Sequence, residues 1–175
     1  MSLVSPSLQA GARAPDFALP DAEGRLHSLG RLNPGGLVWL TFFKISCPTC
    51  QSSLHFIDRL NRRLAATNLR VWTISQDPPD HTRMFNKEFE IELPCLFDSE
   101  DQRFPVSEAY GLVYVPTTFL IEPDSRIAQV SVGWDRAEFE NMARTFAAAA
   151  GLSNLTLFED GEHVDENRLG CASKN

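Results

Sequence analysis

The stretch LVWLTFFKISCPTCQSSLHFI, at residues 37–57, decides the fold. It begins with the continuous apolar run LVWLTFF, whose length and bulky residues predict a strand buried on both faces. Apolar side chains then recur at helical spacing, with charged residues between them, at Leu54, Ile57, Leu60 and Leu64. The stretch therefore predicts a buried strand followed by an amphipathic helix, with Cys47 and Cys50 at the junction.

The position of Cys47 at the start of the predicted helix has a chemical consequence. The first helical turn has unpaired backbone N–H groups and the positive end of the helix dipole, and both favour a thiolate over a thiol. We therefore expect Cys47 to have a lowered pKa and to act as the nucleophile, with Cys50 as the resolving thiol. Pro48 suits the first turn, where no backbone donor is needed, and Pro48 and Thr49 are candidate modulators of the redox chemistry.

Two other interpretations of the CxxC motif stay open from the residues alone. A structural disulfide here would close a small ring, which restricts the unfolded chain little. A zinc site would need two further ligands. The remaining cysteines and histidines form no second compact cluster in the sequence, and they are Cys95, Cys171, His27, His55, His81 and His163. We therefore expect neither a metal nor a cofactor, and reversible thiol chemistry is the leading interpretation.

The flanking segments predict a mixed α/β domain. The order of strand, helix and a second buried strand at residues 69–75 implies a right-handed parallel crossover. The other expected elements are a hairpin at 15–30, a helix around 82–91, a short strand in LPCLFD, two antiparallel strands over 117–133, and a helix from Asp135 to Gly151. No linker or repeat divides the chain, so residues 1–151 are predicted to form one domain and residues 152–175 a loosely held tail.

These features resemble the thioredoxin-fold redoxins, in particular the AhpC/TSA- and TlpA-like thiol-disulfide oxidoreductases related to peroxiredoxins. The likeness covers about residues 11–150. APDFALPDAEGRLHSL is similar to the N-terminal hairpin of that branch, LVWLTFFKISCPTCQSSL to its active-site strand and helix, and AYGLVYVPTTFLIEPDSRI is the most diagnostic match. The resemblance implies a thioredoxin-like fold, with a central mixed β-sheet flanked by helices and an N-terminal β-hairpin extension.

The resemblance also assigns roles to Val115 and Pro116, which correspond to the family's cis-proline loop beside the disulfide. Val115 would offer backbone hydrogen bonds to an extended substrate segment, and Pro116 in the cis form would permit that approach. The alternative is that Pro116 begins an edge strand in the trans form, as most X-Pro bonds do. We expect the cis form.

The chain departs from the family pattern near the two thiols. Ser46 stands where the family often has Trp, while Thr41 and Ser53 stand where many members have a buried acid that handles the proton of the resolving thiol. Because neither hydroxyl is a general acid or base, we expect proton transfer to use water or another group. Lys44 either stabilises the Cys47 thiolate or faces solvent.

A thiol-dependent peroxidase is the competing enzyme class. Peroxiredoxins place a hydroxyl donor three residues before the peroxidatic cysteine, together with an upstream Pro and a later Arg. Here position 44 is Lys and no PxxxTxxC motif occurs, which disfavours peroxidase activity as the main function. A third hypothesis is a thioredoxin-like binding module without catalysis.

The two remaining cysteines have different surroundings. Cys95 lies among apolar residues in LPCLFD, which predicts a buried and inert thiol. Cys171 lies near the terminus in LGCASKN, where it is either an additional resolving thiol, as in some peroxiredoxins, or an idle exposed thiol.

Composition and charge limit the partners. Apolar residues make up 43% and charged residues 22% of the 175 residues, as in an ordinary globular protein. The net charge of -7 and the lack of a Lys/Arg-rich segment give no reason to expect nucleic acid binding. No apolar run approaches the roughly 20 residues that span a bilayer. We expect a cytoplasmic protein. A periplasmic or secreted location is the alternative if a signal or anchor was removed before the initial Met-Ser-Leu.

The sequence as a whole predicts a thiol-disulfide oxidoreductase, a monomer or weak dimer that exchanges disulfides with protein partners. Cys47 would attack the disulfide of a partner, and Cys50 would then resolve the mixed disulfide.

Overall fold

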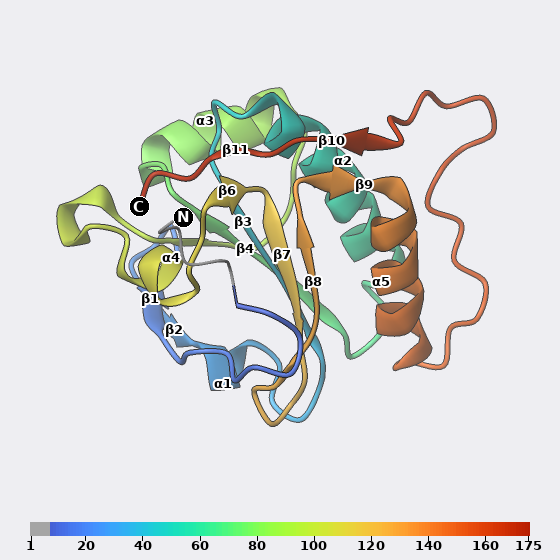
Figure 1. The fold of residues 1–175 in the computed structure, drawn as a ribbon, viewed down its shortest axis with the longest axis horizontal. Helices are drawn as coiled ribbons and strands as arrows, with labels where there is room; N and C mark the ends of the chain where they lie inside the picture. Colours follow the sequence, from blue (N-terminus) through green and yellow to red (C-terminus); the bar gives the residue numbers. More distant parts are fainter. Residues whose placement is uncertain (1–7) are drawn as a thin grey trace, which may run out of the picture.

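A central mixed sheet organises the computed structural model, which describes residues 8–175 (Figure 1). Its strands are β3 (Val38–Phe43), β4 (Arg70–Ser75), β5 (Cys95–Phe97), β7 (Thr117–Ile121) and β8 (Ile127–Val132). They lie in the order β5-β4-β3-β7-β8. Strand β4 is parallel to β3 and β5, whereas β7 is antiparallel to β3 and β8. The predicted thioredoxin-like sheet and its parallel crossover are confirmed.

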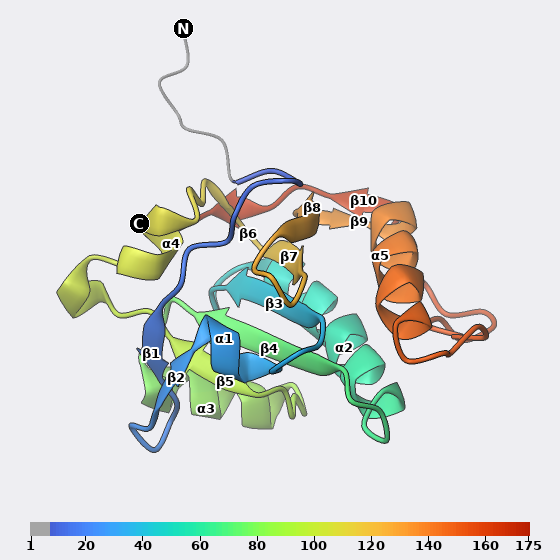
Figure 2. The ribbon, with the colours of Figure 1, turned by 90° about the horizontal axis from the view of Figure 1, so that it is seen from below.

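Helices cover both faces of this sheet. They are α1 (Leu29–Leu32), α2 (Pro48–Arg63), α3 (Pro79–Glu88), α4 (Pro105–Ala109) and α5 (Arg136–Ala148), with a short 3-10 helix at Glu100–Gln102. Trp39 and Phe43, on one face of β3, contact rings of α5 and α3. Phe42, on the other face, contacts Tyr110 at the end of α4. In Figure 2, α2 and α5 lie on one side of β3 and β7, and α1 lies on the other.

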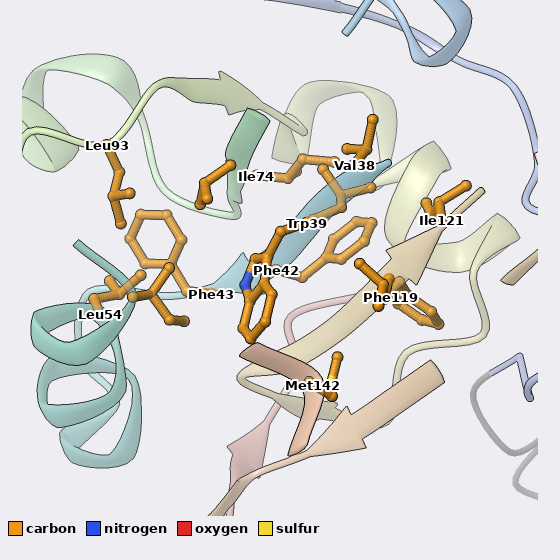
Figure 3. Packing of buried hydrophobic residues seen from close by; sticks show 14 of the residues in the cluster. Val38, Trp39, Phe42, Phe43, Leu54, Ile74, Leu93, Phe119, Ile121 and Met142 are labelled. Carbon is orange, nitrogen blue, oxygen red and sulfur yellow. The ribbon is translucent and has the colours of Figure 1, made fainter. Parts of the chain in front are cut away.

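The core is centred on β3, in which all six residues are buried. Figure 3 shows Phe43 between Leu54 and Leu93, and Trp39 directed toward Met142 of α5. Helices cover both faces of the sheet, so β3 needs apolar side chains on both faces. This explains the continuous apolar run in the sequence. The core therefore fixes the carboxyl end of β3, where the CxxC motif begins.

The N-terminal hairpin is also confirmed. Strands β1 (Ala18–Pro20) and β2 (Leu26–Ser28) are antiparallel. The Asp21 carboxylate accepts backbone N–H groups of Glu23 and Arg25 at 3.0 and 2.9 Å, which fixes the turn between the strands. The hairpin and α1 pack on β4, where Trp72 Nε1 donates to the Leu32 carbonyl at 3.2 Å.

Two predicted helices differ from the structure only in their bounds. Helix α3 begins at Pro79, earlier than predicted, because a proline in the first turn needs no hydrogen-bond acceptor for its nitrogen. Helix α5 begins after Asp135, as the sequence predicted, and the Asp135 carboxylate accepts the Glu138 N–H at 2.9 Å. The helix ends at Ala148, before the expected end at Gly151. None of the helices in residues 8–175 is long and apolar enough to cross a membrane.

The prediction of a loosely held tail is wrong. Strand β10 (Asn167–Arg168) pairs with β9 (Trp134–Asp135), and β11 (Cys171–Ala172) pairs with β6 (Tyr114–Val115), both antiparallel. We call residues 167–173 the C-terminal strap. Figure 1 shows it running back from the long loop after α5, across the top of β6 and β9.

The loop that leads to the strap is anchored as well. Arg59 of α2 forms an ion pair with Glu162 at 2.8 Å, and Trp134 Nε1 donates to the Asp165 carbonyl at 2.7 Å. Leu157 is buried against the core. Strands of two residues leave no periodic pattern, so hydrophobic spacing gave no sign of this docking.

Candidate active site

Cys47 lies between β3 and α2, as the sequence predicted. It is the N-cap residue of α2, and its Sγ accepts the backbone N–H of Cys50 at 3.2 Å. Pro48 occupies the first helical turn. A sulfur at this position faces the unpaired N–H groups and the positive end of the helix dipole, so the local backbone favours negative charge on Cys47.

The surroundings of Cys47 lower its pKa to about 5. The largest cause is the Cys50 thiol, which donates toward Cys47 Sγ. The Cys171 thiol and the backbone N–H of Cys50 act in the same direction, whereas burial opposes them. Cys47 is therefore a thiolate at neutral pH, which is the reactive form of cysteine.

We expect the Cys47 thiolate to titrate with a midpoint at about pH 5. A lowered pKa means that the thiolate is lost only when the pH falls through this value, instead of near the usual value of about 8.5. The ultraviolet absorbance of the thiolate measures this titration. A Cys47→Ser variant should lack the acidic step, and a wild-type protein with no thiolate below about pH 7 would contradict the prediction.

Cys50 is the more shielded partner of the pair. It is fully buried in the first turns of α2. Burial raises its pKa well above the usual value, and the neighbouring Cys47 raises it further. The order of ionisation is therefore fixed, because Cys47 loses its proton first and its negative charge then holds the proton on Cys50.

The Val115–Pro116 peptide bond is cis, as the sequence predicted. Val115 lies in β6, and its carbonyl oxygen is 3.4 Å from Cys47 Sγ. The backbone edge beside the thiols is thus formed by Val115, but this edge is already paired with the C-terminal strap.

The strap contacts the first turns of α2 directly. The Thr49 hydroxyl donates to the Leu169 carbonyl at 2.7 Å, and Arg168 donates to the Ser52 hydroxyl at 3.1 Å. Thr49, predicted as a modulator of the redox chemistry, therefore holds the strap against the CPTC motif.

Cys171 is brought to the site by the strap. It is the register partner of Val115, and its thiol lies close enough to Cys47 to help lower the pKa of Cys47. Burial and the neighbouring Cys47 raise the pKa of Cys171. Cys171 is thus a partly buried free thiol on the strap beside Cys47, and it does not lie apart from the site.

Lys44 is half-buried beside the strap. Its Nζ donates to the carbonyl of Ala172 at 2.5 Å, so its charge lies against the strap. Asp77, a buried acid that the sequence analysis missed, accepts the Ile45 N–H at 2.8 Å and pairs with Lys174 at 2.6 Å. The signal for Asp77 was its place just after the carboxyl end of β4, beside the end of β3 that leads to the CxxC motif.

A family model now gives this arrangement its context. The model described as the AhpC/TSA family matches residues 10–130. The chain belongs to the AhpC/TSA family. The match includes β3, the CPTC motif and the cis-proline loop, and it ends before the strap.

Known proteins similar to this AhpC/TSA chain include a thiol-disulfide oxidoreductase ResA from Geobacillus thermodenitrificans. It is 29% identical over 128 residues, which cover 73% of this chain and 71% of the relative. The solved structure of a putative thiol:disulfide interchange protein DsbE from Chlorobium tepidum has a TM-score of 0.70 and 28% identity, and covers 83% of this chain and 100% of that one. Peroxidoxin BcpB from Mycobacterium tuberculosis, at 24% identity and a TM-score of 0.68, covers 81% and 97% and shows the likeness in fold.

Thr41 and Ser53, the two hydroxyls noted in this AhpC/TSA chain, are both engaged in hydrogen bonds. Thr41 Oγ1 accepts from Trp39 Nε1 at 3.0 Å and bonds the Thr118 hydroxyl at 2.9 Å. The Ser53 hydroxyl donates to the Thr49 carbonyl at 2.7 Å. Both are buried, and neither brings a carboxylate to Cys50.

Cys95 lies apart from this thiol cluster, on β5 at the edge of the sheet. The residue is partly exposed, yet burial of its thiol raises the pKa to about 12. A thiol with so high a pKa carries almost no thiolate at neutral pH, so we expect Cys95 to be unreactive. Among residues 8–175 no group of three or more His, Cys, Asp or Glu side chains is placed to hold a metal ion.

Proposed function

We propose that the protein exchanges disulfides with partner proteins through Cys47 as the nucleophile and Cys50 as the resolving thiol. Its enzyme class, thiol-disulfide oxidoreductase, follows from its family and from relatives of that name. The observation that supports these roles best is the hydrogen bond of 3.2 Å from the Cys50 N–H to Cys47 Sγ, at the start of α2.

The first step uses the low pKa of Cys47. Its thiolate attacks one sulfur of a partner disulfide, a mixed disulfide forms, and the other partner sulfur leaves as a thiolate. A thiolate that is stable at neutral pH needs no separate base for this attack.

The second step uses the change in charge that the first step makes. Once Cys47 is in a mixed disulfide it carries no negative charge, so the contribution of that charge to the high pKa of Cys50 disappears. Cys50 then loses its proton and attacks Cys47 Sγ. The partner leaves as a dithiol, and a Cys47–Cys50 disulfide remains, so two electrons have passed from this pair to the partner.

The environment of position 44 gives no support to peroxidase chemistry as the main function. Lys44 stands where a peroxiredoxin needs a hydroxyl donor, and its side chain is occupied with the strap. We therefore propose protein thiols and disulfides as the substrates, with a second protein that restores the redox state of the pair.

An equilibrium titration in glutathione buffers tests this proposal. We expect Cys47 and Cys50 to form a reversible disulfide in a Cys171→Ser variant of the full chain, identified by mass spectrometry of unreduced peptides. A Cys171→Ser/Cys95→Ser variant is the matched control and should show the same pairing. If Cys47 and Cys50 stay unpaired at every ratio of oxidised to reduced glutathione, the proposed dithiol exchange is wrong.

A further inference from the structure

The strap occupies the backbone edge beside the nucleophile. Cys171 lies opposite Val115 in the antiparallel pair of β11 and β6, and the Val115 carbonyl oxygen is 3.4 Å from Cys47 Sγ. A strand paired at this edge therefore presents its side chain at position 171 next to the catalytic sulfur. In this chain that side chain is itself a cysteine.

The contacts on either side of Cys171 hold it in this register. The Leu169 carbonyl accepts the Thr49 hydroxyl at 2.7 Å, and the Ala172 carbonyl accepts Lys44 Nζ at 2.5 Å. The Ser173 N–H donates to the Val113 carbonyl at 3.0 Å. Main-chain groups before and after the cysteine are thus bound, so its position does not depend on the thiol alone.

Gly170 makes the close approach possible. A Cβ atom built at this residue would lie 2.8 Å from the Val115 carbonyl oxygen and 3.1 Å from the Tyr114 Cβ. Any side chain at position 170 would thus push the strap away from β6, and with it the adjacent Cys171.

Two other free thiols consequently lie beside the sulfur of Cys47. Cys50 adjoins Cys47 in the first turn of α2, where its backbone N–H donates to Cys47 Sγ at 3.2 Å. Cys171 adjoins Cys47 through its register partner Val115, whose carbonyl oxygen is 3.4 Å from the same sulfur. Cys47 is completely buried between them. A partner protein cannot reach Cys47 while the strap is docked.

We propose that the strap is an internal substrate of the thiol pair. Its Cys171 forms a disulfide with Cys47 by exchange with the Cys47–Cys50 bond, and the strap must leave the Val115 edge before a partner binds. This inference rests on the proposed function, since partner disulfides supply the oxidised pair. It assigns to Cys171 a role that dithiol exchange at the CxxC motif does not require.

The exchange needs no further oxidant. Cys171 loses its proton and attacks Cys47 Sγ of the Cys47–Cys50 disulfide, so the Cys47–Cys171 bond forms as the Cys47–Cys50 bond breaks. Cys50 leaves as a thiolate and takes up a proton. One disulfide is present before and after the step, so the oxidation level of the protein is unchanged.

The test treats the full chain with glutathione disulfide and identifies the bonds by mass spectrometry of unreduced peptides. In a Cys50→Ser variant we expect a Cys47–Cys171 disulfide, and in a Cys50→Ser/Cys171→Ser variant we expect glutathione to stay on Cys47. In the oxidised wild-type chain we expect both Cys47–Cys50 and Cys47–Cys171 bonds. Because the wild-type chain needs no substitution, it provides a readout even if a variant fails to fold.

The outcomes separate this inference from the proposed function. If Cys50→Ser keeps glutathione on Cys47 while Cys171 stays reduced or pairs with another copy, and the wild-type chain contains no Cys47–Cys171 bond, the internal substrate is overturned and the nucleophile is not. If Cys47 takes no glutathione in the double variant, the assignment of Cys47 as nucleophile fails, and the inference fails with it.

Discussion

Replacing Cys47 by serine is expected to abolish disulfide exchange. A serine hydroxyl at the N-cap of α2 keeps the helix start, but it carries no anion at neutral pH and does not attack a disulfide. We expect the rate at which the protein reduces a test disulfide, such as that of insulin, to fall by about 10³-fold or more, as for the loss of other catalytic nucleophiles.

Two variants sharpen this experiment. Cys95→Ser is the matched control and should retain the wild-type rate, because Cys95 lies on β5 and burial raises its pKa to about 12. Cys50→Ser should still attack but should stop at a mixed disulfide, or at a bond with Cys171. A Cys47→Ser variant that keeps more than about a tenth of the activity would contradict the assigned roles.

Gly170→Ala is expected to uncover Cys47. The new methyl group would meet the Val115 carbonyl oxygen at 2.8 Å, and a backbone atom in a paired strand cannot move aside easily. Overpacking of this kind costs about 1–3 kcal/mol, which would increase the population with a detached strap by roughly 5- to 150-fold. The rate at which iodoacetamide alkylates Cys47 measures this population, because Cys47 is fully buried under the strap.

Gly30→Ala supplies the control for this substitution. Gly30 lies in α1, and a Cβ atom there would meet nothing within 4 Å, so alkylation of Cys47 should not change. Equal alkylation rates in wild type and Gly170→Ala would mean that the strap does not shield the thiolate. Amide hydrogen exchange at Ser173, whose N–H is bonded to Val113, reports strap detachment independently.

The fold could be predicted because its strongest signals are local. An apolar run of strand length, a helix with one apolar face and an acidic N-cap at Asp135 can each be recognised from the residues of one short segment. The position of Cys47 and Cys50 at the start of the helix followed from the junction of two such elements. The cis form of Pro116 rested on resemblance, and the structure confirms it.

The strap could not be predicted because its order comes from distant partners. The docking of Cys171 depends on Val115, on Thr49 and on Lys44, none of which is near it in the sequence. Asp77 was missed for the same reason, since its partners Ile45 and Lys174 belong to other elements. Two-residue strands and single side-chain contacts carry no periodicity, so only the three-dimensional structure reveals them.

The docked strap also has an electrochemical consequence. It lies against the reduced form of the thiol pair, in which the Cys171 thiol helps to lower the pKa of Cys47. Because linkage is reciprocal, a strap that binds the dithiol more tightly than the disulfide stabilises the dithiol by the same free energy. Each 1.4 kcal/mol of this preference raises the reduction potential by about 30 mV, so the strap contacts that differ between the dithiol and the disulfide set how strongly the pair oxidises its partners.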